Sequence, residues 1–192
     1  MQWLLICSLL YPVLLFAQKP ILNQVQKKDE YTYVPELNLT QYEGVWFEVY
    51  EDLFDETFQK GGRCITAEYT LFENGTVGVL NKEILPNGTV GTIAGSAYYE
   101  GDNEGGELTV ELEGTPAPAP YWVIELGPIV EDNYDYAIVS DNLKISLFVL
   151  VRDVDRFFDL YEDEVLDSVE NMGFTRKFNM PIMVNQTSCE FR

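Results

Sequence analysis

Few side chains in this sequence have the chemistry of a catalytic or metal-binding centre. The chain contains three cysteines, Cys7, Cys64 and Cys189, and no histidine. Without histidine there is neither an imidazole base nor the usual nitrogen ligand of a metal ion, and the many carboxylates are scattered along the chain. The sequence therefore predicts no catalytic residue, no metal site and no cofactor, and it favours binding over catalysis.

The cysteines also bear on where the protein functions. The first seventeen residues carry no charge and are apolar from Leu4 to Phe16, which is typical of a secretory signal (1–17) cleaved after Ala17 and too short for a membrane anchor. Its removal takes Cys7 away and leaves Cys64 and Cys189 in an oxidising compartment, where we expect them to pair. Closing so long a loop stabilises by about 4 to 5 kcal/mol in the chain-entropy model. Two buried free thiols are the less favoured alternative.

Possible modification sites agree with export from the cell. Glycosylation acceptor motifs begin at Asn38, Asn74, Asn87 and Asn185. Asn74 and Asn87 are each followed by glycine, and Asn-Gly is also ordinary hairpin-turn chemistry, so these two motifs have a purely structural reading as well. The sequence predicts a secreted, extracellular glycoprotein without saying which sites are occupied.

The charge of the chain excludes some partners. Its 32 acidic and 12 basic side chains give a net charge of −20. Such a field repels nucleic acid and anionic membrane surfaces and keeps a protein soluble, so we expect no nucleic-acid partner and no stable membrane insertion. The 46% hydrophobic content is far above that of a disordered chain, and the length suits one domain at 18–192.

The elements that carry these side chains are indicated by turn signals, which recur every 8 to 15 residues from about residue 42 to 152. They separate short runs rich in Val, Ile, Tyr and Thr, a pattern typical of an all-β fold. Eight strands are expected near 45–54, 62–73, 76–84, 89–99, 107–112, 120–126, 134–141 and 145–152. Joined by short turns, they most simply form an antiparallel up-and-down β-barrel whose interior admits one small ligand.

One amphipathic helix follows the strands. Apolar residues spaced by three and four predict it over 154–172, and Gly173 ends it. Its acidic outer face indicates a helix packed on the outside of the barrel, against the apolar outward positions of the first and last strands, Phe47, Val49, Leu147 and Val149. A tail at 173–192, tethered by the disulfide, completes the domain.

Four sequence blocks carry a resemblance to a known family. They are Tyr42-Glu-Gly-Val-Trp-Phe-Glu-Val49, Gly62-Arg-Cys-Ile65, Tyr121-Trp-Val-Ile124 with Tyr134-Asp-Tyr-Ala-Ile-Val139, and Leu147-Phe-Val-Leu-Val-Arg152. Together they resemble the lipocalins, and in particular apolipoprotein D and its insect and bacterial relatives. The resemblance implies that Gly44, Trp46 and Arg152 form the structural signature at the closed end of the barrel, and that Cys64 pairs with Cys189. Arg152 is then expected to lie over the Trp46 indole as a cation–π pair.

The strand phase set by Trp46 and Tyr69 predicts the cavity wall. The expected lining residues are Tyr69, Leu112, Trp122, Ile124, Phe148 and Leu150, with Asn81 added because its position lines the pocket in the resembling family. Asn81 and the Tyr69 hydroxyl would orient a polar end of the ligand, although any of these residues can instead fill a core. Glu48 shares the inward phase of Trp46 and is expected to be satisfied by a nearby hydroxyl or arginine.

The leading functional prediction is extracellular binding and transport of a fatty acid, sterol or similar lipid in this cavity. A bilin-type pigment is an alternative ligand. A module that contacts a cell-surface receptor through its exterior is an alternative function. An isomerase-like enzyme is disfavoured because it requires a free cavity thiol. The ligand's identity and the oligomeric state are not predicted.

Overall fold

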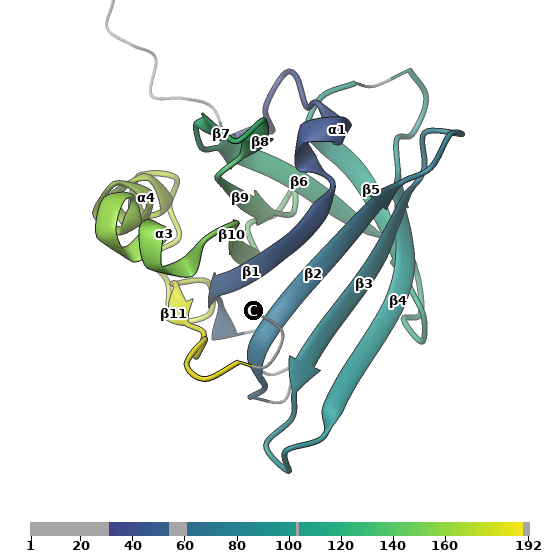
Figure 1. The fold of residues 1–192 in the computed structure, drawn as a ribbon. Coiled ribbons are helices and arrows are strands. Elements are labelled where there is room, and N and C mark those ends of the chain that lie inside the picture. Colours follow the sequence, from purple (N-terminus) through teal and green to yellow (C-terminus); the bar gives the residue numbers. More distant parts are fainter. Residues whose placement is uncertain (1–30, 54–60, 103, 190–192) are drawn as a thin grey trace, which may run out of the picture. The chain divides into compact units, whose positions relative to one another are not determined.

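The computed structural model describes residues 31–53, 61–102 and 104–189, so the expected signal at 1–17 lies outside the described residues. Within this range eight antiparallel strands pair in chain order, and β10 pairs with β1 to close a barrel (Figure 1). The strands are β1 (Gly44–Glu51), β2 (Arg63–Leu71), β3 (Val77–Ile84), β4 (Val90–Tyr98), β5 (Glu107–Leu112), β6 (Ala119–Leu126), β9 (Tyr136–Ser140) and β10 (Leu147–Val151). The predicted eight-stranded up-and-down barrel is confirmed.

Two of the hairpin turns follow directly from their Asn-Gly dipeptides. Gly75 and Gly88 have φ angles of 82° and 83°, a left-handed conformation that glycine adopts without steric cost. The Asn74 and Asn87 side chains accept hydrogen bonds from the backbone N–H two residues further on, at 3.1 and 3.0 Å. These local bonds fix the turns between β2 and β3 and between β3 and β4, and thus the register of three strands.

Several short elements were not predicted. A four-residue helix, α1 (Leu39–Tyr42), precedes β1; β7 (Ile129–Val130) and β8 (Asn133–Tyr134) form a small separate hairpin; and β11 (Ile182–Met183) pairs with the outer part of β1. Each is too short to produce a recognisable hydrophobic period. β11 gives the predicted tail a backbone attachment to the barrel.

The predicted helix over 154–172 is two helices, α3 (Val154–Leu160) and α4 (Glu162–Asn171), separated at Tyr161. Asp153 caps α3 by accepting the Arg156 N–H at 2.9 Å, whereas Tyr161 leaves the helical region with φ −123° and ψ −18°. The acidic run that follows Tyr161 occupies the first turn of α4, where the helix dipole favours negative charge. The chain leaves α4 through Gly173 at φ 97°, as expected.

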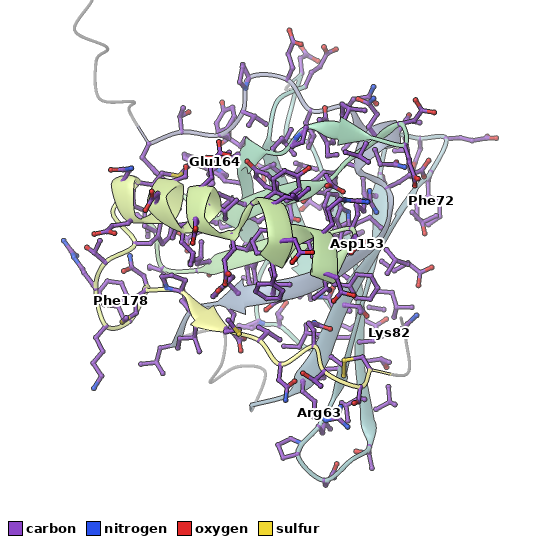
Figure 2. The ribbon with its side chains drawn as sticks, turned by 60° about the vertical axis from the view of Figure 1, so that its left-hand side comes forward. Arg63, Phe72, Lys82, Asp153, Glu164 and Phe178 are labelled. Carbon is purple, nitrogen blue, oxygen red and sulfur yellow. A yellow bond between two sulfur atoms is a disulfide. The ribbon has the colours of Figure 1, made fainter. Side chains whose placement is uncertain are left out.

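The helices lie across the outside of the barrel, over the side formed by β1, β9 and β10 (Figures 1 and 2). Side chains of the helices and of these strands pack together in a group that we call the outer cluster. It contains the predicted outward residues Val49, Leu147 and Val149, and Phe47 packs beside it. Its buried members are Val49, Tyr50, Ile124, Tyr136, Ile138, Leu147, Val149, Val151, Val154, Phe157, Val165, Val169 and Phe174. The predicted position of the helical segment is confirmed.

A second group of buried residues, the inner cluster, lies inside the barrel. Its members are Leu37, Tyr42, Trp46, Ala67, Tyr69, Val77, Val79, Ala97, Leu108, Val123, Ala137, Val139 and Leu150. Strand alternation explains the division, because successive side chains of one strand point to opposite faces of the sheet.

The C-terminal tail is bound to the base of β1 and β2. Cys64 and Cys189 form a disulfide with their Cα atoms 5.4 Å apart, which confirms the predicted pairing. The buried Gln186 side chain donates to the backbone carbonyls of Glu48 at 2.7 Å and Ile65 at 2.8 Å. Covalent and hydrogen-bonded anchors thus lie within four residues of each other on the tail.

Candidate ligand-binding site

A cavity of about 750 Å³ occupies the barrel between the inner cluster and the loops that follow β3, β5 and β9. Its wall combines inward side chains of the strands with residues of these loops. Those used below are Tyr42, Glu48, Ala67, Tyr69, Val79, Asn81, Lys82, Glu83, Leu108, Val110, Leu112, Glu113, Tyr121, Phe148 and Leu150. Apolar groups make up most of this set.

Trp46 and Arg152 close one end of the barrel. The Trp46 side chain is fully buried, and the Arg152 guanidinium carbon lies 3.8 Å from the centre of its ring, which confirms the predicted cation–π pair. Arg152 also donates to the backbone carbonyls of Glu43 at 2.7 Å and Val45 at 2.8 Å. Burial lowers the pKa of Arg152 to about 10, and its partners keep it a structural cation.

Gly44 allows this close approach. It has a φ of 100°, and a Cβ atom added there would lie 3.1 Å from the Arg152 guanidinium. Both the left-handed backbone and the lack of space explain why glycine, and no larger residue, precedes the buried tryptophan by two positions. The signature residues inferred from the resemblance therefore form one structural unit.

Three phenols meet at the inner end of the cavity. The Tyr121 hydroxyl lies 2.7 Å from that of Tyr42 and 2.9 Å from that of Tyr69. Burial raises the pKa of Tyr121 well above its ordinary value, and the neighbouring phenols raise it further. The Tyr69 hydroxyl, expected to orient a ligand, is thus already bonded within this tyrosine trio.

The cavity brings together most of the predicted site residues. Tyr69, Asn81, Leu112, Phe148 and Leu150 all line it. The Asn81 Oδ1 atom is buried and has no hydrogen-bond partner among the described residues, so this amide is a polar group of the wall that a ligand could satisfy.

The predictions for Trp122 and Ile124 were wrong, because neither side chain faces the cavity. Tyr121 pairs with the inward Leu108, so Trp122 points outward, where Tyr33 contacts its ring with centroids 5.1 Å apart. Ile124 sits at an irregularity in the β6–β9 register and belongs to the outer cluster. A strand phase carried over from β1 and β2 cannot anticipate either effect.

Sequence reasoning also missed Tyr42, Tyr121, Val110 and Glu83 as wall residues. Val110 was detectable, since alternation from the correctly predicted Leu112 gives its phase, whereas the phase of Tyr121 depends on the pairing of β6 with β5. Tyr42 belongs to the four-residue helix that no periodicity reveals. Glu83 shares the phase of Asn81, but a carboxylate is seldom assigned to a buried face.

Charged groups are unevenly placed around the cavity. Glu48, which is 5% exposed, Glu83 and Glu113 all contribute to the wall. In the part of the chain that the structure describes, Lys82 is the one basic residue of the wall, and its Nζ lies 3.0 Å from Glu68 Oε2. Figure 2 shows Lys82 on the side of the barrel away from the helices.

The predicted glycosylation acceptors share one local geometry. Asn38, Asn74, Asn87 and Asn185 are all exposed, and the side-chain oxygen of each accepts the backbone N–H two residues further on. The side-chain oxygen is thus engaged in a local turn at each of these exposed positions.

Neither a cluster of metal ligands nor a membrane-spanning helix appears among residues 31–53, 61–102 and 104–189. No three His, Cys, Asp or Glu side chains gather there as metal ligands do. No helix of this range has both the length and the apolarity needed to cross a bilayer.

A closed antiparallel barrel with an apolar cavity and an external helical segment defines a class of small-ligand binding proteins, and comparison with known proteins gives the family. The family model described as a lipocalin-like domain matches residues 37–181, so this chain belongs to the lipocalin family. Lipocalins bind small hydrophobic ligands, and most are binding proteins and not enzymes.

Individual relatives support this assignment. Apolipoprotein D of Rattus norvegicus is 36% identical over 102 residues, which cover 53% of this chain and 50% of that protein. The chain thus matches about half the length of this relative. Temperature-induced lipocalin-1 of Arabidopsis thaliana is 31% identical over 153 residues, 75% of this chain and 78% of that one. Lobster apocrustacyanin A1 has the same fold, with a TM-score of 0.58 at 18% identity over 84% of this chain and 96% of its own.

Proposed function

We propose that this protein binds one small hydrophobic molecule in the barrel cavity and carries it outside the cell. The observation that supports this most directly is the cavity itself. Its volume of about 750 Å³ lies within the range of roughly 300 to 1,000 Å³ found for small-molecule sites, and its wall is mostly apolar with few polar groups. Each methylene that a ligand buries there contributes about 0.8 kcal/mol.

Three features support an extracellular setting. The Cys64–Cys189 disulfide is a bond that persists in oxidising compartments, and the four exposed acceptor asparagines suit glycosylation during export. The apolar segment at 1–17 would direct that export. Sterols, fatty acids and similar lipids are the ligand classes expected from the sequence.

The proposed role requires no catalysis. Cys64 and Cys189 are bonded to each other, and the chain has no histidine, so the described residues offer no free cavity thiol and no imidazole base.

A visible absorption band on the purified native protein would favour the pigment-binding alternative.

A pair of substitutions on one strand tests the proposal. Val110 lines the cavity, whereas the next residue, Glu111, is exposed on the outer face of β5. In calorimetric titration with a neutral sterol or long-chain alcohol, the unmodified protein should saturate at one equivalent. Val110→Trp should weaken binding at least about tenfold by filling the cavity, and Glu111→Trp should leave it unchanged.

Two results would count against the proposal. One is the absence of saturable binding with every apolar class tried. The other is equal binding by the two tryptophan variants, which would locate the ligand outside the cavity.

A further inference from the structure

Three polar side chains of the cavity wall, Glu48, Asn81 and Glu83, lie on β1 and β3, while Glu113 lies at the end of β5. Trp46 pairs with Ala67, and Ala67 pairs with Asn81, so these residues form one inward-facing row across the three strands. Glu48 lies two residues beyond Trp46 and Glu83 two residues beyond Asn81, and both therefore share this inward face. One wall of the cavity thus presents two carboxyl groups and an amide.

The inward side chains of β5 and β10 are different in character. Leu108, Val110 and Leu112 on β5 and Phe148 and Leu150 on β10 are all apolar and all line the cavity. A ligand that fills this space meets hydrocarbon on these strands and acidic, hydrogen-bonding groups on β1 to β3. The arrangement suits an amphipathic molecule with a single polar end.

No cation of the described wall is available to a carboxylate ligand. Lys82 is held 3.0 Å from Glu68 Oε2. Arg152 lies behind Trp46 and is occupied by backbone carbonyls and by the indole ring. A fatty-acid anion in the cavity would leave water without gaining a positive partner and would approach the carboxyl groups of Glu48 and Glu83.

A ligand that donates a hydrogen bond, in contrast, can pair with the side-chain oxygen of Asn81. The Asn81 Oδ1 atom is buried and has no partner in the part of the chain that the structure describes, and an unpaired buried acceptor carries the full cost of its lost hydration. An ammonium group supplies several N–H donors together with the charge that a carboxylate attracts. An alcohol supplies a donor but no charge, and a carboxylate supplies no donor and carries a negative charge.

We propose that the cavity selects ligands that carry a protonated amine on an apolar body, and that Glu48 and Asn81 set this preference. The inference rests on the proposed function and names the ligand class of the same site. It ranks amines above neutral alcohols and alcohols above fatty-acid anions.

Dodecylamine, dodecanol and dodecanoate test this ranking, because they share one hydrocarbon chain and differ in the polar end. At neutral pH we expect calorimetric titration of the full-length protein to give at least about tenfold tighter binding for the amine than for dodecanoate, with the alcohol between them. Since the net charge of −20 attracts cations to the whole surface, amine binding must also saturate at one equivalent and be weakened at least about tenfold in Val110→Trp.

Isosteric variants assign the preference to residues. Glu48→Gln should weaken dodecylamine binding about tenfold and change dodecanol binding by less than about twofold, because it removes charge and keeps shape. Asn81→Leu should weaken both the amine and the alcohol, since both donate to its oxygen. Glu111→Gln removes one exposed carboxylate from the outer face of β5 and should alter none of the three affinities.

The outcomes separate this inference from the function on which it rests. If dodecanol binds in the cavity but dodecanoate binds as tightly as dodecylamine or more tightly, the amine preference is overturned and the carrier function stands. An amine preference that persists unchanged in both Glu48→Gln and Asn81→Leu overturns the assignment to these residues. Failure of all three ligands to bind refutes the proposed function itself.

Discussion

The inner and outer clusters are built from alternate residues of the same strands, yet they are packed differently. On β10 the outward residues Leu147, Val149 and Val151 have no exposed surface, because the helices cover them completely. The inward Phe148 is only partly buried, because it borders the cavity. One strand thus contributes tight packing on one face and a ligand-accessible wall on the other.

This difference indicates where the stability of the protein originates. An open cavity forgoes the contacts that a filled core would make, and lost packing of this kind is costly. The outer cluster and the closed end at Trp46 must therefore supply most of the packing energy. Substitutions in the outer cluster should change stability without changing affinity, and those at the cavity should do the reverse.

The largest expected effect is in the outer cluster. Phe157 on α3 is 1% exposed, so Phe157→Ala should destabilise the protein by about 3 to 5 kcal/mol while leaving ligand affinity unchanged. Leu160→Ala is the control, since Leu160 is 65% exposed and should cost less than about 0.5 kcal/mol. Urea unfolding measures both. Equal, small losses would mean that the helices are dispensable.

At the closed end, Arg152→Leu should destabilise by about 3 kcal/mol, because it removes the cation–π pair and the donors to the backbone carbonyls of Glu43 and Val45. Arg152→Lys should recover part of this loss, since it restores the charge but not the planar fork of donors. Thermal unfolding of the two variants gives the comparison. A leucine variant as stable as the unmodified protein would contradict the structural role.

Alkaline pH should weaken the inner cluster. Burial raises the pKa values of Tyr42 and Tyr121 well above 10.0, so above about pH 10 the unfolded chain loses phenolic protons that the folded chain retains. This stabilisation is complete below pH 10 and falls by about 1.4 kcal/mol per pH unit and per phenol as the pH rises further. Unfolding followed against pH, with Tyr121→Phe for comparison, should show a shallower decline in the variant. Identical slopes would mean that these phenols titrate normally.

The smallest expected change in stability is at the cavity. Phe148→Ala should cost no more than about 1.5 kcal/mol because the side chain is already partly exposed to the cavity, but it should weaken ligand binding about tenfold. Its neighbour Val149, fully buried in the outer cluster, provides the matched control. Val149→Ala should leave affinity unchanged. If both substitutions altered affinity equally, the division between the two faces would not hold.

Local rules explain what the sequence predicted well. Asn74-Gly75 and Asn87-Gly88 specify tight turns, and alternation in β2 and β5 gave the correct inward residues, because both signals depend on neighbours within a few positions. The motif around Trp46 led to the family and to Arg152 as its partner. Cys64 and Cys189 were predicted to pair because they are the two cysteines that remain once the expected signal with Cys7 is removed.

The errors occurred where phase depends on pairing between strands. Trp122 faces outward because the residue before it pairs with an inward residue of β5, and the segment at 31–34 covers its outward face. The local pattern of β6 encodes neither the pairing nor the covering segment. The break at Tyr161 and the strand β11 likewise depend on what the barrel presents to them.

The sequence by itself determined the number and order of the strands, the closed barrel and the residues of its signature, because short-range alternation and turn chemistry suffice for these. Only the tertiary structure decided which side of β6 borders the cavity and which polar groups remain unpaired there. Register and side-chain pairing join residues far apart in the chain, and the acidic, hydrogen-bonding wall of the cavity exists only once β1, β2 and β3 lie side by side.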